Sequence, residues 1–253
     1  MSSATLELMT ENSNATFTKK IAVVTGGSSG IGAATAEALA HDGWYVIVAA
    51  RRQDRIKEVA ERIGGSAIEL DVTSDESVER LVAEVAKFGR VDLLVNNAGG
   101  AKGLDPLREA NIEDWKWMYD TNVLGTVRVT KALYPLLLAS EGLIVNIGSM
   151  AALNAYAGGS GYNAAKFGLR ALTRSMRLEE VENPVRITEI DPGRVATDFS
   201  LVRFKGDQDK AEAVYGDKLN LTAGDIAEAI RWVASLPAHM NIDSMNIMPR
   251  DQA

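Results

Sequence analysis

Seven short apolar runs recur along the chain, separated by segments with a helical pattern of apolar positions. The runs cover residues 21–24, 45–49, 66–70, 91–95, 143–147, 186–190 and 244–247. Most are almost entirely apolar rather than alternating, which is typical of parallel strands covered on both faces. Strands that alternate with helices favour right-handed crossovers. The pattern therefore predicts an α/β protein with a doubly wound, seven-stranded parallel sheet.

Two local features refine the helical segments. Thr222 and Asp225, three residues apart, predict a capping box at the start of the last long helix. Pro135 lies inside the helical segment 115–139 and should kink or shorten it, because proline lacks the amide hydrogen and its ring clashes with the preceding turn.

The alternation begins near Lys19 and continues without a repeat, a low-complexity block or a linker. We therefore expect residues 19–253 to form one domain. Residues 1–18 are rich in Ser, Thr, Asn and Glu and lack a usable periodicity, so we expect a flexible tail there.

Composition narrows the classes of function. The chain has 253 residues and no cysteine, which excludes a disulfide framework, a thiolate nucleophile and cysteine-ligated metals. Its net charge of −7 argues against a broad electrostatic grip on nucleic acid or anionic lipid. No apolar run approaches the roughly 20 residues of a membrane span, and no signal-peptide pattern opens the chain. We expect a cytoplasmic protein without a metal site.

A glycine-rich loop follows the first predicted strand and leads into an alanine-rich helix. Gly26, Gly30 and Gly32 would let the backbone turn tightly and approach a pyrophosphate at the helix N-terminus. Their spacing, Gly-x-x-x-Gly-x-Gly, differs from the usual Gly-x-Gly-x-x-Gly, and a tight turn alone would also explain the glycines. Their position between strand and helix favours dinucleotide binding.

The end of the second predicted strand bears on the choice of cofactor. Folds that bind NAD usually place an acidic residue there, on the ribose 2′-hydroxyl. This chain has Arg51 and Arg52 instead. Two guanidiniums suit the 2′-phosphate of NADP, although they are also explained as a solvated pair at a helix start. Asp71, after the third strand, suits either the adenine amino group or a strand-end cap.

Tyr162 and Lys166 lie four residues apart on a predicted helix, which puts both side chains on one face. The pair alone is a weak signal, since this spacing arises readily by chance. Ser149, however, directly follows the strand 143–147, and open α/β sheets place their sites at the carboxyl ends of strands. A helix cap would explain Ser149 taken singly. Together the three residues indicate a catalytic site.

These motifs together resemble the short-chain dehydrogenase/reductase family. The matching segments occur in the family's order, and the resemblance extends over nearly the whole chain from Lys19: Thr25–Gly32, Asn96–Gly99, Asn122, Ser149, Tyr162-x-x-x-Lys166 and Pro192-Gly193. The resemblance implies a single Rossmann-fold domain, hydride transfer with NAD or NADP, and usually a homotetramer.

The resemblance also implies roles for four residues. Tyr162 would be the general acid in carbonyl reduction or the base in alcohol oxidation. A free phenol has a pKa near 10, which the Lys166 ammonium and the oxidised nicotinamide would lower. Lys166 would also hydrogen-bond the nicotinamide ribose. Ser149 would steady the substrate oxygen, and Asn122 would hold a water that links Lys166 to solvent.

The implied cofactor site draws on most of these segments. The backbone around Pro192 and Gly193 would fix the carboxamide, and the Thr197 hydroxyl would meet a phosphate. The expected contacts are Gly26, Ser28, Ser29, Gly30, Ile31, Gly32, Arg51, Arg52, Asp71, Val72, Asn97, Ala98, Gly99, Tyr162, Lys166, Pro192, Gly193, Val195 and Thr197. Many NADP-using relatives carry a basic residue where this chain has Ser29. The preference for NADP therefore depends on the two arginines, and use of both cofactors stays open.

The substrate is less constrained. The stretch of about residues 198–220 corresponds to the family's substrate lid. The segments 155–159, 198–207 and 236–242 resemble those of NADP-dependent 3-hydroxy acid dehydrogenases, which act on serine and allo-threonine. Arg194, Arg203 and Lys205 offer cations for a substrate carboxylate, although Arg203 and Lys205 are equally explained as solvated lid charges. The expected substrate contacts are Ser149, Tyr162, Arg194 and Arg203.

Two alternatives remain at this point. Reductases of bulkier aldehydes, of the clavaldehyde type, share much of this outline. Some proteins of this fold bind NADPH as sensors without doing chemistry, but they tend to lose the tyrosine or the lysine. Because this chain keeps both residues, an enzyme is favoured.

Overall fold

The computed structural model of the protein describes residues 18–252 and contains one seven-stranded parallel sheet, ordered β3-β2-β1-β4-β5-β6-β7. The strands are β1 (Ile21–Thr25), β2 (Tyr45–Ala50), β3 (Ser66–Glu69), β4 (Leu93–Asn96), β5 (Leu143–Ile147), β6 (Arg186–Pro192) and β7 (Ser244–Ile247). The predicted α/β class and seven-stranded Rossmann sheet are confirmed. The tail expected over residues 1–18 lies outside the described residues except for its last position.

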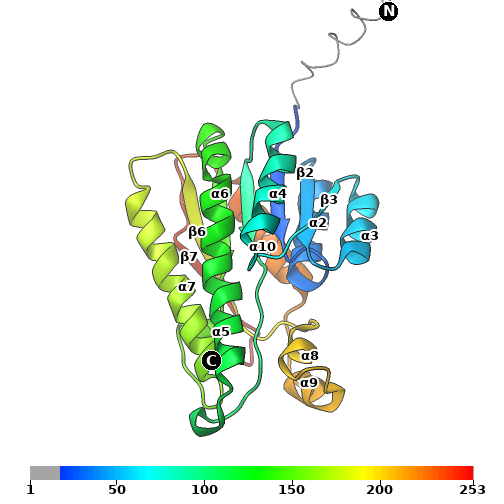
Figure 1. Ribbon diagram of the computed structural model, residues 1–253, viewed down its shortest axis with the longest axis vertical. Helices are drawn as coiled ribbons and strands as arrows, with labels where there is room; N and C mark the ends of the chain where they lie inside the picture. Colours follow the sequence, from blue (N-terminus) through cyan, green and yellow to red (C-terminus); the bar gives the residue numbers. More distant parts are fainter. Residues whose placement is uncertain (1–17, 253) are drawn as a thin grey trace, which may run out of the picture.

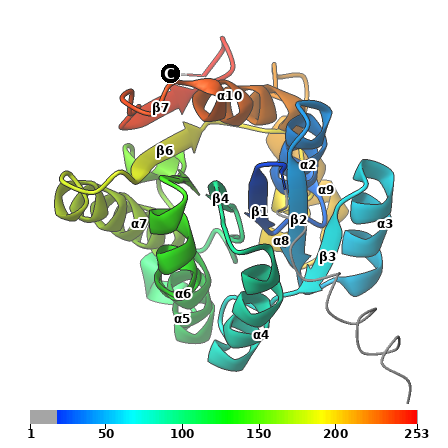
Figure 2. The ribbon, with the colours of Figure 1, turned by 90° about the horizontal axis from the view of Figure 1, so that it is seen from above.

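Helices cover both faces of this sheet (Figures 1 and 2). They are α2 (Gly30–His41), α3 (Gln53–Ile63), α4 (Asp75–Val85), α5 (Ile112–Tyr119), α6 (Gly125–Ala139), α7 (Ser160–Glu179), α8 (Phe199–Arg203), α9 (Gln208–Tyr215) and α10 (Ala223–Ser235). In Figure 2, α4, α6 and α7 lie on one side of the sheet, while α2 and α10 lie on the other. In Figure 1, α8 and α9 project at the lower end of the molecule.

The apolar strands are explained by a core on each face. Ala22 and Val24 of β1 belong to the cluster beneath α2 and α10, whereas Ile21 and Val23 belong to the cluster beneath α4 and α6. All four residues are buried. Because successive strand side chains point to opposite faces, a strand covered on both faces must be apolar at every position.

The helical segment predicted over residues 115–139 divides at a different place from the one expected. α6 continues through Pro135 to Ala139, and Leu133 and Leu137 are packed in the core on either side of the proline. The division comes instead at a π-helical turn, Asp120–Leu124, between α5 and α6. The predicted capping box at Thr222 and Asp225 is present at the start of α10.

A row of polar side chains crosses the middle of the apolar sheet. Asn96 of β4 pairs in register with Asn146 of β5, which pairs with Glu189 of β6. The Asn96 amide donates to Asn146 Oδ1 at 2.9 Å, and the Asn146 amide donates to Thr173 Oγ1 of α7 at 2.9 Å. These three strand residues are buried.

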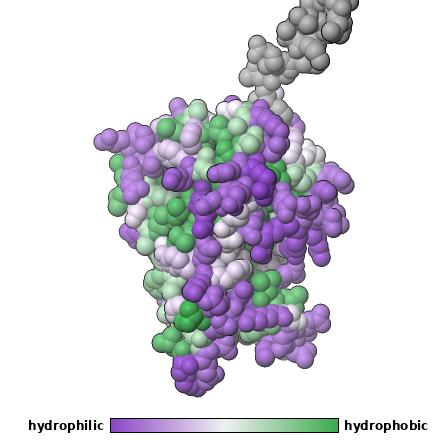
Figure 3. Space-filling model, viewed as in Figure 1, coloured by the Kyte–Doolittle hydropathy of each residue, from purple (hydrophilic) through white to green (hydrophobic). Residues whose placement is uncertain are grey.

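The face drawn in Figure 3 is mostly hydrophilic, with apolar groups scattered among the charged ones. Such scattered exposure is normal for a folded surface. Within residues 18–252, none of the helices is both long and apolar enough to cross a bilayer.

Candidate active site

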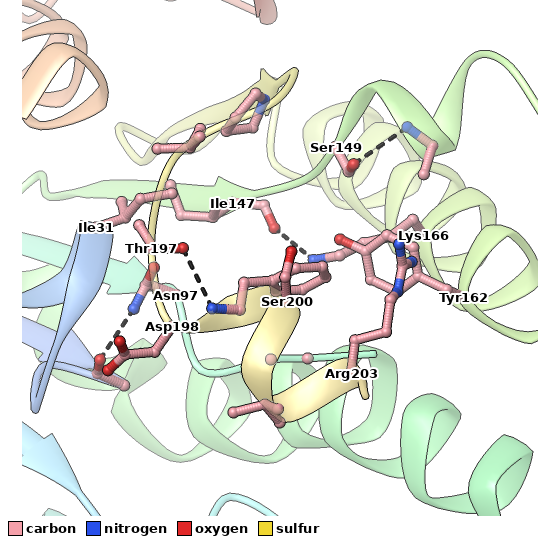
Figure 4. Close-up of a pocket in the computed structure, with 18 of the residues that line it drawn as sticks. Ile31, Asn97, Ile147, Ser149, Tyr162, Lys166, Thr197, Asp198, Ser200 and Arg203 are labelled. Carbon is pink, nitrogen blue, oxygen red and sulfur yellow. Dashed lines mark hydrogen bonds between the residues drawn. The ribbon is translucent and has the colours of Figure 1, made fainter. Parts of the chain in front are cut away.

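A cavity of about 1060 Å³ opens at the carboxyl ends of the central strands, beneath α8 and α9. It lies where the strand order reverses between β1 and β4, which is where open α/β sheets bind ligands. Segments far apart in the chain line it together: the glycine loop, the end of β2, the residues after β4, β5 and β6, the start of α7, and α8 (Figure 4).

The glycine loop packs tightly against the segment that follows β4. Gly26 has a φ of +64°, and a Cβ there would lie 2.8 Å from Asn97 Nδ2. A Cβ on Gly32 would lie 2.5 Å from the Gly26 carbonyl oxygen. The Asn97 amide donates to the carbonyl oxygens of Thr25, at 2.9 Å, and of Gly26, at 3.2 Å. Asn97 therefore fixes the shape of the loop, so these glycines are required even before a ligand is considered.

The start of α2 offers free donors to an anion. Ser29 is the N-cap residue, but its side chain makes no capping hydrogen bond. The first N–H groups of a helix have no partner within the helix, so an uncapped N-terminus is suited to a phosphate. Gly30 lies beside Thr197, which is 3.4 Å from the position of a Cβ on that glycine. The structure thus places Thr197 at this helix end.

Arg52 turns back toward the glycine loop. Its Nη2 donates to Ser28 Oγ at 2.8 Å and to Ser29 Oγ at 2.6 Å, and its Nε donates to Ser28 Oγ at 3.1 Å. Arg51 is exposed at the same edge of the cavity. Sequence reasoning named Ser28 and Ser29 as cofactor contacts but gave them no link to Arg52. The structure shows that both serine hydroxyls accept hydrogen bonds from Arg52, and that Arg51 lines the same cavity.

Asp71 acts as a strand-end cap. Its Oδ1 accepts hydrogen bonds from the backbone N–H of Thr73, at 3.0 Å, and from the Thr73 hydroxyl, at 2.7 Å. Partial burial raises the pKa of Asp71, but these hydrogen bonds outweigh it and the net pKa is lowered. Its contact with adenine stays a prediction.

Tyr162, Lys166 and Ser149 come together at the floor of the cavity. Ser149 follows β5 and caps the short 3-10 turn Met150–Ala152. Its φ of −175° is ordinary extended backbone. Its hydroxyl is a hydrogen-bond neighbour of the Tyr162 phenol. One turn further along α7, Lys166 Nζ donates to the Ile147 carbonyl oxygen at 2.8 Å (Figure 4).

Burial dominates the titration of this group in the protein alone. It raises the pKa of Tyr162 to about 12, against the opposing effects of Ser149 and the Arg203 charge. It lowers the pKa of Lys166 to about 8, against the negative charges of Glu189 and Asp191. We expected the Lys166 ammonium and the oxidised nicotinamide together to lower the pKa of the Tyr162 phenol, and this stays a prediction.

Asn122 lies in the π-helical turn between α5 and α6 and is buried. Its amide nitrogen donates to the carbonyl oxygens of Gly100, at 2.9 Å, and Met118, at 2.7 Å, while its Oδ1 accepts from the Gly100 N–H at 3.2 Å. A Cβ on Gly99 would lie 2.5 Å from Asn122 Oδ1 and 3.7 Å from Lys166 Nζ. Asn122 therefore holds the segment after β4 close to Lys166. The water expected beside it stays a prediction.

The three candidate cations for a substrate carboxylate have different surroundings. Arg194 donates to Asn220 Oδ1, the Leu219 carbonyl oxygen and Asp251 Oδ1, at 2.7 to 2.9 Å. Lys205 donates to Asp114 of α5 at 2.9 Å. These contacts anchor the two side chains to the protein. Of the expected substrate contacts, Arg194 is therefore less available than the sequence indicates.

Arg203 is the cation that faces the phenol. Its guanidinium carbon lies 5.1 Å from the centre of the Tyr162 ring and 5.3 Å from that of Phe199 (Figure 4). Its Nη2 donates to the Tyr156 hydroxyl at 2.5 Å, while its buried Nε has no partner. Tyr156 is a residue to which sequence reasoning gave no role; its only signal was the similarity of segment 155–159 to known dehydrogenases.

The fold, the glycine loop and the Ser149–Tyr162–Lys166 group define a nucleotide-dependent oxidoreductase, and the chain belongs to the short-chain dehydrogenase/reductase family. The family described as short chain dehydrogenase matches residues 20–207.

Particular relatives confirm the resemblance to 3-hydroxy acid dehydrogenases. An uncharacterized oxidoreductase of Mycobacterium tuberculosis is 56% identical over 236 residues, 93% of either chain. The NADP-dependent 3-hydroxy acid dehydrogenase YdfG of Escherichia coli (strain K12) is 40% identical over 238 residues, which cover 92% of this chain and 96% of the relative. The closed form of serine dehydrogenase complexed with NADP+ superposes with a TM-score of 0.89 at 40% identity, over 92% of this chain and 96% of that one.

Proposed function

We propose that this oxidoreductase transfers a hydride between NADP(H) and a small 3-hydroxy acid or the corresponding carbonyl compound. The observation that carries the proposal is Arg203, whose guanidinium stands over the Tyr162 ring with a buried, unpartnered Nε. A buried donor without a partner is costly, so it favours an acceptor supplied by a ligand. A carboxylate close to the reacting hydroxyl would supply that acceptor. The names of the 3-hydroxy acid and serine dehydrogenase relatives support the same substrate class.

The residues at the other end of the cavity fit NADP. Arg51, Arg52, Ser28 and Ser29 form a cluster of donors suited to a 2′-phosphate, and the uncapped start of α2 suits a pyrophosphate. The hydrogen bonds of Arg52 go to serine hydroxyls rather than to a carboxylate, so its charge is not neutralised by a paired acid. The clavaldehyde-type reductase and the NADPH sensor are outcomes of the tests below.

In this mechanism the chain's own groups bind and orient the substrate and move one proton. Bound NADP supplies the hydride acceptor for oxidation or the hydride donor for reduction. Tyr162 Oη takes the proton of the substrate hydroxyl in oxidation and returns it in reduction. Ser149 hydrogen-bonds the same substrate oxygen, and Arg203 fixes the carboxylate. The positive charges of Lys166 and Arg203 stabilise the phenolate that forms when Tyr162 acts as an acid.

The proposal is tested by initial rates of NADP+ reduction, with NAD+ alongside, for serine, allo-threonine and 3-hydroxypropionate. The methyl ester of 3-hydroxypropionate is the matched control because it keeps the hydroxyl and removes the carboxylate charge. Losing a charge-assisted hydrogen bond of about 1.5–3 kcal/mol would lower kcat/KM about 10- to 150-fold. Arg203→Met should remove this preference for the acid over the ester.

Three outcomes would count against the substrate class. If acid and ester react equally well in the unchanged protein, Arg203 does not bind a carboxylate. If the panel is silent while larger aldehydes are reduced with NADPH, the protein is a reductase of bulkier carbonyl compounds. If NADPH binds but no carbonyl or alcohol reacts, it is a non-catalytic NADPH-binding protein.

We also propose that the protein is a cytoplasmic homotetramer and that residues 198–220 form its substrate lid. Within that stretch, α8 and α9 border the cavity and Lys205 ties α8 to Asp114 of α5. Sedimentation equilibrium of the full chain tests the assembly, and a monomer or dimer would contradict it.

A further inference from the structure

Two carboxyl groups are buried together directly behind the proposed catalytic site. Glu189 and Asp191 lie two positions apart on β6, so they point to the same face of the sheet. Their exposed fractions are 2% and 0%. Carboxyl groups are almost never fully buried without a partner, because removing a carboxylate from water is costly. The mechanism above uses neither residue.

Asp191 is well satisfied as a carboxylate. Its Oδ1 accepts the backbone N–H of Ser149 at 2.9 Å, and its Oδ2 accepts from Arg170 Nη1 of α7 at 3.1 Å. The same carboxylate crowds the residue before Ser149, since a Cβ on Gly148 would lie 2.1 Å from Asp191 Oδ1. Asp191 therefore fixes the backbone that carries the Ser149 hydroxyl.

Glu189 is in a different condition. Both of its carboxyl oxygens are buried without a hydrogen-bond donor, and Arg170 Nη1 approaches Oε1 only to 3.5 Å. The nearby Thr173 hydroxyl donates instead to the Leu169 carbonyl oxygen at 2.9 Å. The carboxyl of Asp191 borders the same glycine, because a Cβ on Gly148 would lie 2.1 Å from Asp191 Oδ1 and 3.1 Å from Glu189 Oε1. Besides burial, Asp191 raises the pKa of Glu189, and the weaker effects of Thr173 and Arg170 oppose that rise. Two adjacent carboxyls can bond to each other only when one of them carries a proton.

The charged groups around the pair all come from α7. Arg170 contacts both carboxyls. The charges of Glu189 and Asp191 raise the pKa of Lys166, and the charge of Asp191 raises that of Tyr162. The neighbouring strands β5 and β7 contain no charged residue. Burial raises the pKa of Glu189 most, and the charge of Asp191 raises it further. Asp191 keeps its donors from Ser149 and Arg170, so Glu189 is the better place for the proton.

We propose that Glu189 and Asp191 are positioning residues for the catalytic group and share one proton, with Glu189 donating to the Asp191 carboxylate. Asp191 holds Ser149 in place and keeps a negative charge near Lys166. Protonated Glu189 gives the Asp191 carboxylate a further hydrogen-bond donor without adding a second negative charge. As the pH rises, Glu189 loses the shared proton, and the added negative charge helps Lys166 to keep its own. The inference rests on the proposed roles of Ser149, Tyr162 and Lys166, but not on the identity of the substrate.

Glu189→Gln is the decisive variant, because a glutamine amide has the same shape and can donate to Asp191 as the protonated acid does. With any accepted substrate, kcat near pH 6.5 should stay within about twofold of the unchanged protein. The alkaline decline in the rate of carbonyl reduction should move to lower pH by about half a unit to one unit, because the variant cannot gain the second negative charge beside Lys166. Asp191→Asn should lower kcat about tenfold or more at every pH, with the Kd for NADPH unchanged.

Asp92→Asn is a matched control. Asp92 is also a buried carboxylate that accepts a backbone N–H, from Ile21 at 2.8 Å, and an arginine, Arg90, at 2.9 Å. It precedes β4 and therefore lies at the opposite end of the parallel strands from the cavity. Its variant should lower the Tm without moving the pH profile.

Infrared spectroscopy supplies a readout that needs no substrate. The unchanged protein at pH 6.5 should show the carbonyl stretch of a protonated carboxylic acid, which Glu189→Gln removes and Asp92→Asn keeps. The absence of that band overturns the shared proton, even if the variant fails to fold. A loss of rate in Glu189→Gln that is equal at every pH shows that Glu189 is ionised throughout and also overturns it. A rate unaffected in Asp191→Asn overturns the positioning role. A failed substrate panel would leave the infrared result standing, so the two proposals can fail separately.

Discussion

Replacing Arg52 by alanine tests the binding of the 2′-phosphate. In the structure its guanidinium reaches Ser28 and Ser29 through three hydrogen bonds of 2.6 to 3.1 Å, so the donors are already gathered at the edge of the cavity. A hydrogen bond between charged groups contributes about 1.5–3 kcal/mol net. Since about 1.4 kcal/mol corresponds to tenfold in affinity, the variant should bind NADPH about 10- to 150-fold more weakly. NADH has no 2′-phosphate, so its Kd should change less than about threefold.

The assay is titration of the protein with NADPH and NADH, followed by the fluorescence of the reduced nicotinamide. Arg55→Ala is the matched control, because Arg55 is an exposed arginine of α3, the helix whose N-cap residue is Arg52, and does not line the cavity. It removes the same charge and should leave the ratio of the two Kd values unchanged. If Arg52→Ala weakens the binding of NADPH and NADH equally, Arg52 shapes the loop rather than binding the 2′-phosphate, and the argument for NADP is refuted.

Three further predictions concern the catalytic group and the loop. Tyr162→Phe should lower kcat about 10²- to 10⁴-fold while NADPH still binds, and near-normal turnover would remove Tyr162 from the mechanism. The rate of carbonyl reduction should fall as the pH rises through about 8, because burial lowers the pKa of Lys166 to about 8 and the neutral amine cannot stabilise the phenolate that forms when Tyr162 gives up its proton. A pH–rate series should show this fall in the unchanged protein and not in Lys166→Met. Gly32→Ala should lower the Tm by several degrees, because its Cβ would lie 2.5 Å from the Gly26 carbonyl oxygen, and an unchanged Tm would show that the loop can shift.

The main architecture follows from the sequence because strand periodicity and loop chemistry are local signals. The apolar runs placed all seven strands, although β6 extends to Pro192 beyond the predicted end. The position of Ser149 after β5 was likewise predictable, since the carboxyl ends of parallel strands meet at one edge. Pro135 shows the limit of a local rule, because tertiary packing keeps α6 continuous through it.

Contacts between distant segments could not be predicted in this way. In the structure Arg194 donates to Asn220 and Asp251, but the residues near Arg194 in the sequence do not predict these partners. The carboxyl pair had a visible signal, since two acids two positions apart lay in or directly after a run predicted to be buried. Its meaning depends on Arg170 and on the Ser149 N–H, which only the folded chain brings beside it.

The polar row across the sheet has a consequence for how the strands find their alignment. β4 and β5 are both short and strongly apolar, with the sequences LLVN and LIVNI, so hydrophobic burial alone distinguishes poorly between neighbouring alignments. A slip of one residue would turn the Asn146 amide to the opposite face, away from Thr173 and from Asn96. It would leave several buried polar groups without partners, at about 1–3 kcal/mol each. The row therefore favours a single register, and substituting Asn146 by leucine should give a sheet whose strands are less uniquely aligned.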